Sequence, residues 1–386
     1  SYYLLLSSLL GALVVSSSRD LLTIFIGIEL ASTPMFLLSG WKKGDRKSNE
    51  GAIKFFLLGV LSASLILYGF SLIYGLTGQL VFADISAYLL ANSLGSSPVL
   101  LLSAILVISG IGFKISVVPF HSWAPDTYEG APLPITAYLS VSSKATGFVA
   151  LIVLLTKVFE SSGQSWGVIL AIVAGATMTL GNLVALQQTN PVRLLAYSSI
   201  SQAGFIIAPL AVSGITGNYQ DGIFASVTYL IIYAFMNIGA FLSVHLFTNF
   251  TKSDNFYEWG GIAKHSPLTG VLTTVFFFSL AGIPPLGGWF AKFVVFRSLL
   301  STGEIIGVSL AIVGAINAVI ALVYYARISK VIWMDELKNP EEDKSFEFQS
   351  PLKVVGALTV LITFVAGIFP GIFSYLGEVS SIFFGN

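Results

Sequence analysis

The sequence lacks cysteine and carries little charge. None of its 386 residues is cysteine, so disulfides, thiolate chemistry, iron–sulfur ligation and cysteine-type zinc sites are excluded from this chain. Only 10% of the residues are charged and 55% are hydrophobic, whereas soluble domains contain about a quarter charged residues. The formal net charge is zero, so nothing suggests a nucleic-acid partner. The composition predicts an all-α polytopic membrane protein.

Histidines and enzyme motifs are also scarce. The three histidines, His121, His245 and His265, lie far apart and form no spaced metal motif. We expect His245 to form a helix–helix hydrogen bond rather than a proton relay, and His265 to be solvated in a loop. No nucleophile elbow, phosphate-binding loop, zinc-protease motif or dinucleotide fingerprint occurs in a suitable context. The chain runs from Ser1 directly into an apolar stretch, so we predict no signal peptide.

Long apolar runs dominate what remains, and a membrane span needs about 20 such residues. They predict about eleven transmembrane helices, at 2–18, 21–40, 51–76, 98–119, 134–157, 165–186, 192–213, 222–249, 266–302, 305–330 and 353–379. Two of these spans are interrupted. The fourth breaks at Pro119 and continues to about residue 131, and the ninth breaks at GIPPLGG, residues 282–288.

Positive charge gathers in alternate loops. The loop 41–49 is rich in lysine and arginine, and the opposite side has only Arg19 and Lys157. Further Lys and Arg residues on the first side lie in the loops 187–193, 250–266 and 327–353. The positive-inside rule places the loop 41–49 in the cytoplasm or its equivalent, with the start of the chain inside and its end outside. We expect the acidic stretch 335–350 to be a solvated, mobile connector.

The two breaks indicate a weak internal repeat. Residues 1–157 and 158–334 each contain five spans, of which the fourth is broken, and 335–386 adds a loop and the last span. Because five is odd, the second unit is inverted in the membrane. Inverted repeats with discontinuous helices are typical of transporters.

Five ionisable residues fall inside apolar runs: Glu29, Lys54, Lys114, Lys144 and Lys292. Such residues are costly in a membrane and usually mark ion or proton pathways. One carboxylate cannot pair with four lysines, so we expect at least one lysine to exchange its proton. A static ion pair or a snorkelling lysine is the alternative, above all for Lys54 beside the basic loop.

Polar residues also surround the first break. His121 follows Pro119 and suits proton transfer, although a capping or loop histidine is nearly as good an explanation. Asp126 and Glu129 could shape a proton path, but we expect them to cap short helices. Arg193 is expected to anchor a helix end.

Four segments identify a family resemblance. They are GIGFKISVVPFHSWAPDTYEGAPLPITAYLSVSSK (110–144), NPVRLLAYSSISQAGF (190–205), TYLIIYAFMNIGAF (228–241) and SLAGIPPLGGWFAKF (279–293). They resemble the antiporter-like membrane subunits of respiratory complex I. With SNEGAIKFFLLG (48–59), the chain is most similar to the subunit N type, which is called subunit 2 in mitochondria and has a counterpart in the photosynthetic relatives of the complex.

The resemblance implies a fold and residue roles. The family fold has fourteen helices with two inverted five-helix repeats, and the spans here would be its helices 4–14, the first three being absent or unrecorded. Glu29 matches the glutamate that pairs with the first lysine, Lys114. Lys144 matches the central lysine, Lys292 the lysine facing the outlet or the next subunit, and Lys54 a lysine often found on helix 6.

The resemblance also implies a function. The chain would be a proton-translocating membrane-arm subunit of a complex I-type NAD(P)H or ferredoxin:quinone oxidoreductase. It would hold no cofactor, and the flavin, iron–sulfur clusters and quinone would belong to partner subunits. Its partners would be lipids and other membrane-arm subunits, including further antiporter-like ones. Its location would be a bacterial plasma membrane, a thylakoid or an inner mitochondrial membrane.

Two alternatives remain. The chain could be a subunit of a multisubunit cation/proton antiporter or of a membrane hydrogenase, which share these motifs. It could also be a scaffold that does not pump, although a scaffold would not need Glu29 and three deep lysines.

Overall fold

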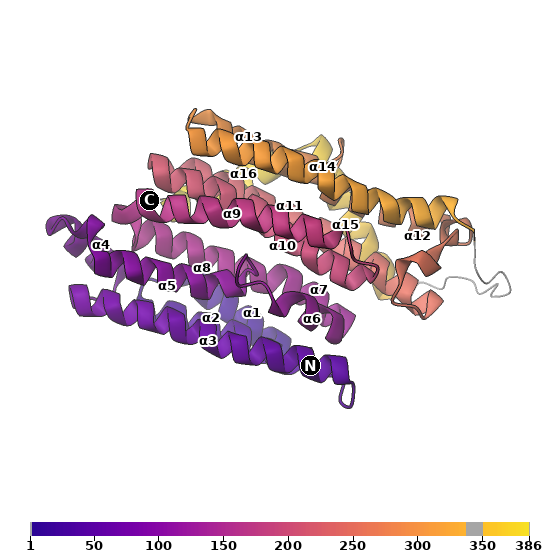
Figure 1. Cartoon of the computed structure of the whole chain (residues 1–386), viewed down its shortest axis with the longest axis horizontal. Helices are drawn as coiled ribbons and strands as arrows, with labels where there is room; N and C mark the ends of the chain where they lie inside the picture. The colour runs from indigo at the N-terminus through magenta and orange to yellow at the C-terminus, as the bar shows by residue number, and fades with distance from the viewer. Residues whose placement is uncertain (1, 337–349, 386) are drawn as a thin grey trace.

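The structure, a computed structural model, describes residues 2–336 and 350–385 as a bundle of helices (Figure 1). The helices are α1 Tyr2–Ser17, α2 Leu21–Ser39, α3 Arg46–Thr77, α4 Phe82–Ala91, α5 Pro98–Lys114, α6 Trp123–Gly130, α7 Leu133–Tyr138, α8 Lys144–Lys157, α9 Gly163–Ala185, α10 Pro191–Thr216, α11 Tyr219–Thr251, α12 Pro267–Ala281, α13 Gly287–Ser301, α14 Ile305–Met334, α15 Ser350–Ile368 and α16 Gly371–Gly385. The connector expected at 335–350 falls almost wholly outside the described residues.

The helices have the length and apolarity that a membrane requires. Among the described residues, eight helical stretches can cross a bilayer by their length and composition. Four others, α1, α4, α5 and α12, are shorter and apolar. The predicted all-helical membrane fold is therefore confirmed.

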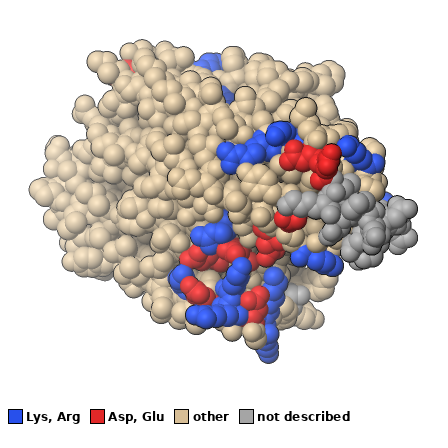
Figure 2. All heavy atoms as spheres, turned by 45° about the vertical axis from the view of Figure 1, so that its right-hand side comes forward, with Lys and Arg blue, Asp and Glu red and all other residues tan. Residues whose placement is uncertain are grey.

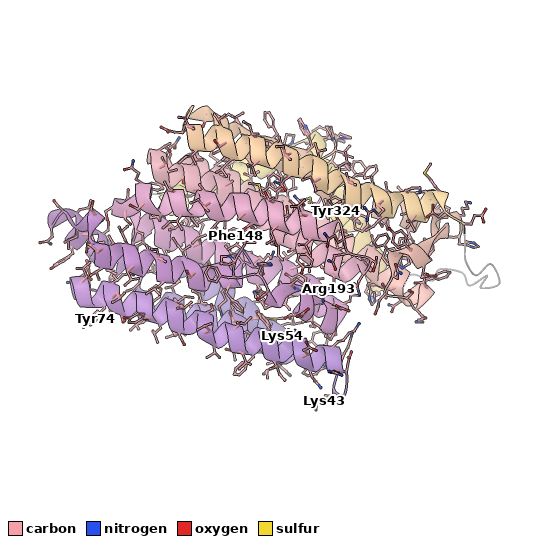
Figure 3. The ribbon with its side chains drawn as sticks, viewed as in Figure 1. Lys43, Lys54, Tyr74, Phe148, Arg193 and Tyr324 are labelled. Atoms are coloured by element: carbon pink, nitrogen blue, oxygen red, sulfur yellow. The ribbon has the colours of Figure 1, made fainter. Side chains whose placement is uncertain are left out.

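Most of the charged side chains visible in Figure 2 gather at one end of the bundle, and most of the remaining surface in that view is uncharged. Lys43, in the loop before α3, lies at this end (Figure 3). The two ends of the chain lie toward opposite ends of the bundle (Figure 1). We call the side with Lys43 the charged end.

Both predicted helix breaks are present. The helix α5 ends at Lys114, and α6 begins only at Trp123. The helix α12 ends at Ala281, and α13 begins at Gly287. Proline explains both breaks, because it lacks an N–H and its ring clashes with a continuing helix.

The prediction of one continuous helix at 353–379 was wrong. The helix α15 ends at Ile368, and α16 begins at Gly371. Pro370 separates them, because proline disfavours helical geometry at the residue before it. Two further features were not predicted: the short helix α4, and a π-helical turn at Leu139–Ser143 between α7 and α8.

The helix α10 lies at the centre of the packing. Of its most apolar 18-residue window, 94% is buried. Gly181 and Gly204 bring α9 and α10 together so closely that a Cβ at either position would meet backbone of the other helix, as small residues do in membrane bundles. Since α10 also contacts α6, α11 and α13, it is in contact with helices that adjoin both breaks.

Candidate functional site

Three lysines are buried within this apolar bundle. Lys114, Lys144 and Lys292 are 4%, 2% and 5% exposed. A buried ammonium is costly unless opposite charge, carbonyl oxygens or water compensate it. The partners of each lysine therefore determine what it can do.

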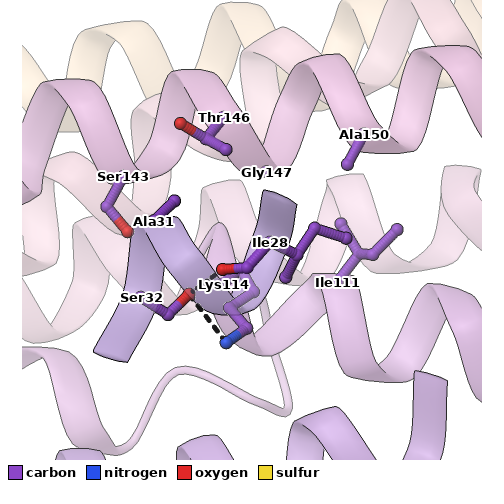
Figure 4. Close-up of a pocket in the computed structure, with 9 residues that line it drawn as sticks. All are labelled: Ile28, Ala31, Ser32, Ile111, Lys114, Ser143, Thr146, Gly147 and Ala150. Carbon is purple, nitrogen blue, oxygen red and sulfur yellow. Dashed lines mark hydrogen bonds between the residues drawn. The ribbon is translucent and has the colours of Figure 1, made fainter. Parts of the chain in front are cut away.

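Lys114 is held by the helix α2. Its Nζ lies 2.9 Å from Ser32 Oγ and 3.3 Å from Glu29 Oε1, and Figure 4 shows the bond to Ser32. The rings of Phe36 and Phe113 lie 5.7 and 5.9 Å from Nζ, within the range of cation–π attraction. The expected pairing of Glu29 with Lys114 is thus present in the structure, between two different helices.

A small cavity extends from Lys114 toward α8 (Figure 4). Its volume is about 10 Å³, which is room for roughly one water molecule. It is lined by Ile28, Ala31, Ser32, Ile111, Lys114, Ser143, Thr146, Gly147 and Ala150. Because Ser143 and Thr146 flank Lys144 in sequence, the cavity leads from the first lysine to the helix of the second.

Lys144 is the first residue of α8, directly after the π-helical turn. Its Nζ donates to the backbone carbonyl of Ser199 on α10, at 2.6 Å. Within the described part of the chain, no carboxylate forms an ion pair with it. The Ser199 hydroxyl accepts a hydrogen bond from Tyr233, at 2.8 Å. The ammonium group of Lys144 therefore binds a backbone carbonyl, and the hydrogen-bonded hydroxyls of Ser199 and Tyr233 lie next to it.

Lys292 is held by the second break. Its Nζ donates to the carbonyls of Leu280 and Ala281, at 3.1 and 2.6 Å. The break leaves these carbonyls without helical partners, and the C-terminal end of a helix favours a cation. The ring of Phe205 lies 5.2 Å from Nζ.

The helix α10 connects the second and third lysines. Gln202, three residues after Ser199, donates through Nε2 to the Leu280 carbonyl that also accepts from Lys292. Tyr229 donates in turn to Gln202 Oε1. Gln202 and Tyr229 were not among the predicted site residues, because neither is charged at neutral pH. The polar run SSISQ at 198–202 inside an apolar helix was the available signal.

The remaining predicted site residues lie apart from these lysines. Lys54 is partly exposed at the charged end and pairs with Asp126 and Glu50, at 2.6 and 2.7 Å. His121 lies half-buried in the segment between α5 and α6, and its Nδ1 is buried without a hydrogen-bond partner among the described residues. The roles expected for both stay predictions.

We had expected Asp126 and Glu129 to cap short helices, but they form ion pairs instead. Both accept from Arg193 at 2.8 Å, Asp126 also pairs with Lys54, and Glu129 pairs with Lys47 at 2.8 Å. We call Lys47, Lys54, Asp126, Glu129 and Arg193 the ion-pair cluster; Figure 3 labels Lys54 and Arg193. Arg193 anchors the start of α10, as predicted, by tying it to α6.

The ion-pair cluster also sets the charge of its carboxylates. Burial alone would raise the pKa of Asp126, but its hydrogen bonds with Lys54 and Arg193 outweigh burial and hold that pKa below its ordinary value. Burial alone would also raise the pKa of Glu129, but its hydrogen bonds with Lys47 and Arg193 outweigh burial and lower that pKa. Both carboxylates are therefore charged at neutral pH.

Among the residues that the structure describes, His245 forms no hydrogen bond to a neighbouring helix, so that prediction was wrong. Its Nε2 lies 3.0 Å from Nδ2 of Asn249, one turn further along the same helix α11. Local pairing four residues apart competes with contacts between helices. His265 is exposed, as expected. Among the described residues, no group of His, Asp and Glu side chains could hold a metal ion.

The sequence is similar to those of known membrane proteins. Residues 18–319 match the family described as NADH:quinone oxidoreductase/Mrp antiporter, TM. The chain is 36% identical over 382 residues to NADH-quinone oxidoreductase subunit N of Heliobacterium modesticaldum, covering 99% of this chain and 77% of that protein. It is 41% identical over 374 residues to NAD(P)H-quinone oxidoreductase subunit 2 of Crocosphaera subtropica, covering 95% and 70%.

Solved structures show the same fold. A chain of respiratory complex I from Thermus thermophilus with bound aureothin aligns at a TM-score of 0.78 and 28% identity, covering 97% of this chain and 79% of that chain. A chain of the archaeal membrane-bound sulfane sulfur reductase aligns at 0.87 and 26%, covering 99% and 75%. A chain of the Mrp complex from a Dietzia species aligns at 0.87 and 20% over 99% and 77%, a likeness of fold alone.

Proposed function

We propose that this chain, which belongs to the NADH:quinone oxidoreductase/Mrp antiporter membrane family, translocates protons. It would be a membrane-arm subunit of a complex I-type NAD(P)H or ferredoxin:quinone oxidoreductase. The flavin, the iron–sulfur clusters and the quinone chemistry belong to partner subunits. The chain itself supplies ionisable side chains and the backbone around them.

One observation carries this proposal: three buried lysines have unequal partners. Lys114 faces a carboxylate, whereas Lys144 and Lys292 face backbone carbonyls. Carbonyl dipoles stabilise an ammonium without neutralising it, and a neutral amine can occupy the same position. Lys144 and Lys292 can therefore alternate between the two states, as a proton relay requires.

The contacts suggest an order of events. Glu29 stabilises the ammonium of Lys114 while the two are close. When the pair separates, the field at α8 changes, and Lys144 passes its proton along the polar residues of α10 toward Lys292. Lys292 then releases the proton to the outlet or to the next subunit.

We also propose that residues 1–157 and 158–334 form inverted repeats, with 335–386 as an addition. Each repeat contains a helix broken beside a buried lysine. Superposing α5–α6 on α12–α13 about an axis in the membrane plane tests this proposal directly.

The alternatives predict different assemblies. The family description, which also names Mrp antiporters, and the likeness to the sulfane sulfur reductase favour an antiporter or another redox complex as the second candidate. Isolation of the native complex distinguishes these candidate functions by the partner subunits that copurify. Quinone-site and iron–sulfur partners support the first, and a complex without them supports the antiporter. A scaffold role predicts that the buried lysines are dispensable.

The test of proton translocation is Lys144→Ala in the assembled complex. We expect proton pumping into vesicles to fall about tenfold or more, because a positioned proton-transfer group contributes at least that much. Lys157→Ala, at the other end of the same helix, is the matched control and should pump normally. Wild-type pumping by an assembled Lys144→Ala complex would contradict the relay role.

A further inference from the structure

Tyr128 has a buried hydroxyl without a well-formed hydrogen bond. It lies on α6 and is 1% exposed, and its ring packs against Trp123 and Phe241 with centroids 6.2 Å apart in both cases. Among the described residues, its hydroxyl makes no hydrogen bond of good geometry, although it lies close to the hydroxyl of Ser199. An unpaired buried hydroxyl is unfavourable, because its hydrogen bonds with water are lost and not replaced. The group is therefore retained at a cost.

Asn237 on α11 shows the same feature. Its Nδ2 donates to Ser140 Oγ at 2.7 Å, but its Oδ1 is buried and has no partner in the described part of the chain. Tyr233 and Phe241 lie four residues before and after it, so the three share one face of α11. Tyr128 packs against Phe241 and interacts electrostatically with Tyr233, which places it against the face of α11 that carries Asn237.

That face of α11 adjoins Lys144. Ser140, which binds Asn237, lies one turn before Lys144. Tyr233 donates to the hydroxyl of Ser199, whose carbonyl holds Lys144 Nζ. Tyr128 lies beside Ser199 as well. Two unpaired buried polar atoms from different helices thus converge on the surroundings of the central lysine.

The opposite face of α6 reaches the charged end. Asp126 and Glu129, on either side of Tyr128 in sequence, belong to the ion-pair cluster and are partly exposed there. A single short helix therefore carries charged groups in contact with the aqueous side and an unpaired hydroxyl beside Lys144.

We propose that Tyr128 and Asn237 bind a water molecule that delivers protons from the charged end to Lys144. The inference rests on the proposed function and assigns the uptake step to these residues. The water transfers a proton to the neutral amine of Lys144, so an O–H bond breaks and an N–H bond forms. The hydroxyl of Tyr128 donates its proton to the hydroxide that this transfer leaves, and it receives one from a hydronium ion on the charged side, which becomes water. No other group changes its charge.

The test compares single and double variants in the assembled complex. We expect Tyr128→Phe to slow proton pumping roughly threefold to tenfold, since it removes one transfer group of a chain. We expect Asn237→Leu to act similarly. The double variant should be no slower than the slower single variant, because both residues hold the same water.

Tyr324→Phe is the matched control. It also removes a fully buried hydroxyl, one that donates to Asn182 Oδ1 at 3.0 Å on the side of α9 and α14. It should pump within about twofold of wild type. A loss equal to that of Tyr128→Phe would mean that any buried hydroxyl matters, and would overturn the assignment.

Lys144→Ala separates this inference from the proposed function. If Lys144→Ala pumps normally, the proposed function fails. If Lys144→Ala loses pumping while Tyr128→Phe and Asn237→Leu keep it, the water site fails and the proposed function stands. High-resolution density for the wild-type complex decides the matter even if the variants do not assemble. A water within about 3 Å of both atoms supports the site, and its absence overturns it.

Discussion

The two helix breaks hold their lysines in different ways. At the first break, Lys114 faces Glu29, a carboxylate that belongs to another helix. At the second, Lys292 faces the carbonyls of Leu280 and Ala281, which the break itself exposes. A partner on a separate helix can move away, whereas a helix end cannot be removed without remaking the break. The partner of Lys114 can therefore move away from it, whereas the partners of Lys292 are fixed by the fold.

Packing at the two breaks supports the same contrast. A Cβ at Gly288 would overlap the Ser279 carbonyl, and a Cβ at Gly367 of α15 would overlap the backbone of Pro285. At the first break, a Cβ at Gly112 would meet only side chains, the nearest being Phe120 at 3.0 Å. A flexible side chain can shift, but backbone cannot. The backbone is therefore packed more tightly around Gly288 and Gly367 than around Gly112.

The largest expected effect comes from Gly288→Ala. Because the added methyl group meets backbone, we expect a destabilisation of about 3 kcal/mol, at the upper end for overpacked cores. The amount of assembled complex should fall several-fold. Quantitative native gels of membranes expressing the variant measure this directly.

Gly112→Ala is the control for that substitution. It adds the same methyl group beside the first break, where Phe120 can move, so the amount of complex should stay within about twofold of wild type. If the two variants assemble equally well, the two breaks do not differ in how tightly the backbone is packed and the comparison fails.

The smallest expected effect concerns the ion-pair cluster, which adjoins only the first break. The pKa values of Asp126 and Glu129 lie below their ordinary values of 3.8 and 4.5. Their stabilising contribution is thus present above those values and is lost as the pH falls through the lowered pKa values. Partly exposed pairs contribute roughly 0.2–1 kcal/mol each.

Arg193→Met should accordingly lower the thermal midpoint of the complex by a few degrees at most at pH 7, and this difference should shrink below about pH 4. Lys330→Met removes an exposed cation near Asp335 and should change the midpoint less. An Arg193→Met difference that grows on acidification would contradict the assigned carboxylate charges.

The membrane fold and the ionisable site could be predicted because their signals are local. Proline breaks a helix wherever it lies, and a lysine inside an apolar run is costly in any arrangement. Pro119 and Lys114 could therefore be identified from the sequence. The pairing of Glu29 with that lysine came from the family resemblance and is present in the structure.

The remainder depends on contacts between residues distant in sequence. Gln202 and Tyr229 are uncharged, and only the packed bundle shows that Gln202 reaches the carbonyl beside Lys292. The pairs of Asp126 join residues 67 and 72 positions away. Pro370 was overlooked because the apolar run continues on both sides of it. The roles of Lys54 and His121 stay predictions.

The most direct measurement is a double-mutant cycle on proton pumping with Glu29→Gln and Lys114→Met. If Glu29 acts through Lys114, the account predicts non-additive losses, with a coupling energy of about 0.5–3 kcal/mol, as for residues in contact. Glu160→Gln removes an exposed carboxylate from another helix turn, and its cycle with Lys114→Met should be additive. Strict additivity of Glu29→Gln with Lys114→Met would contradict the account, because Lys114 would then not respond to its partner.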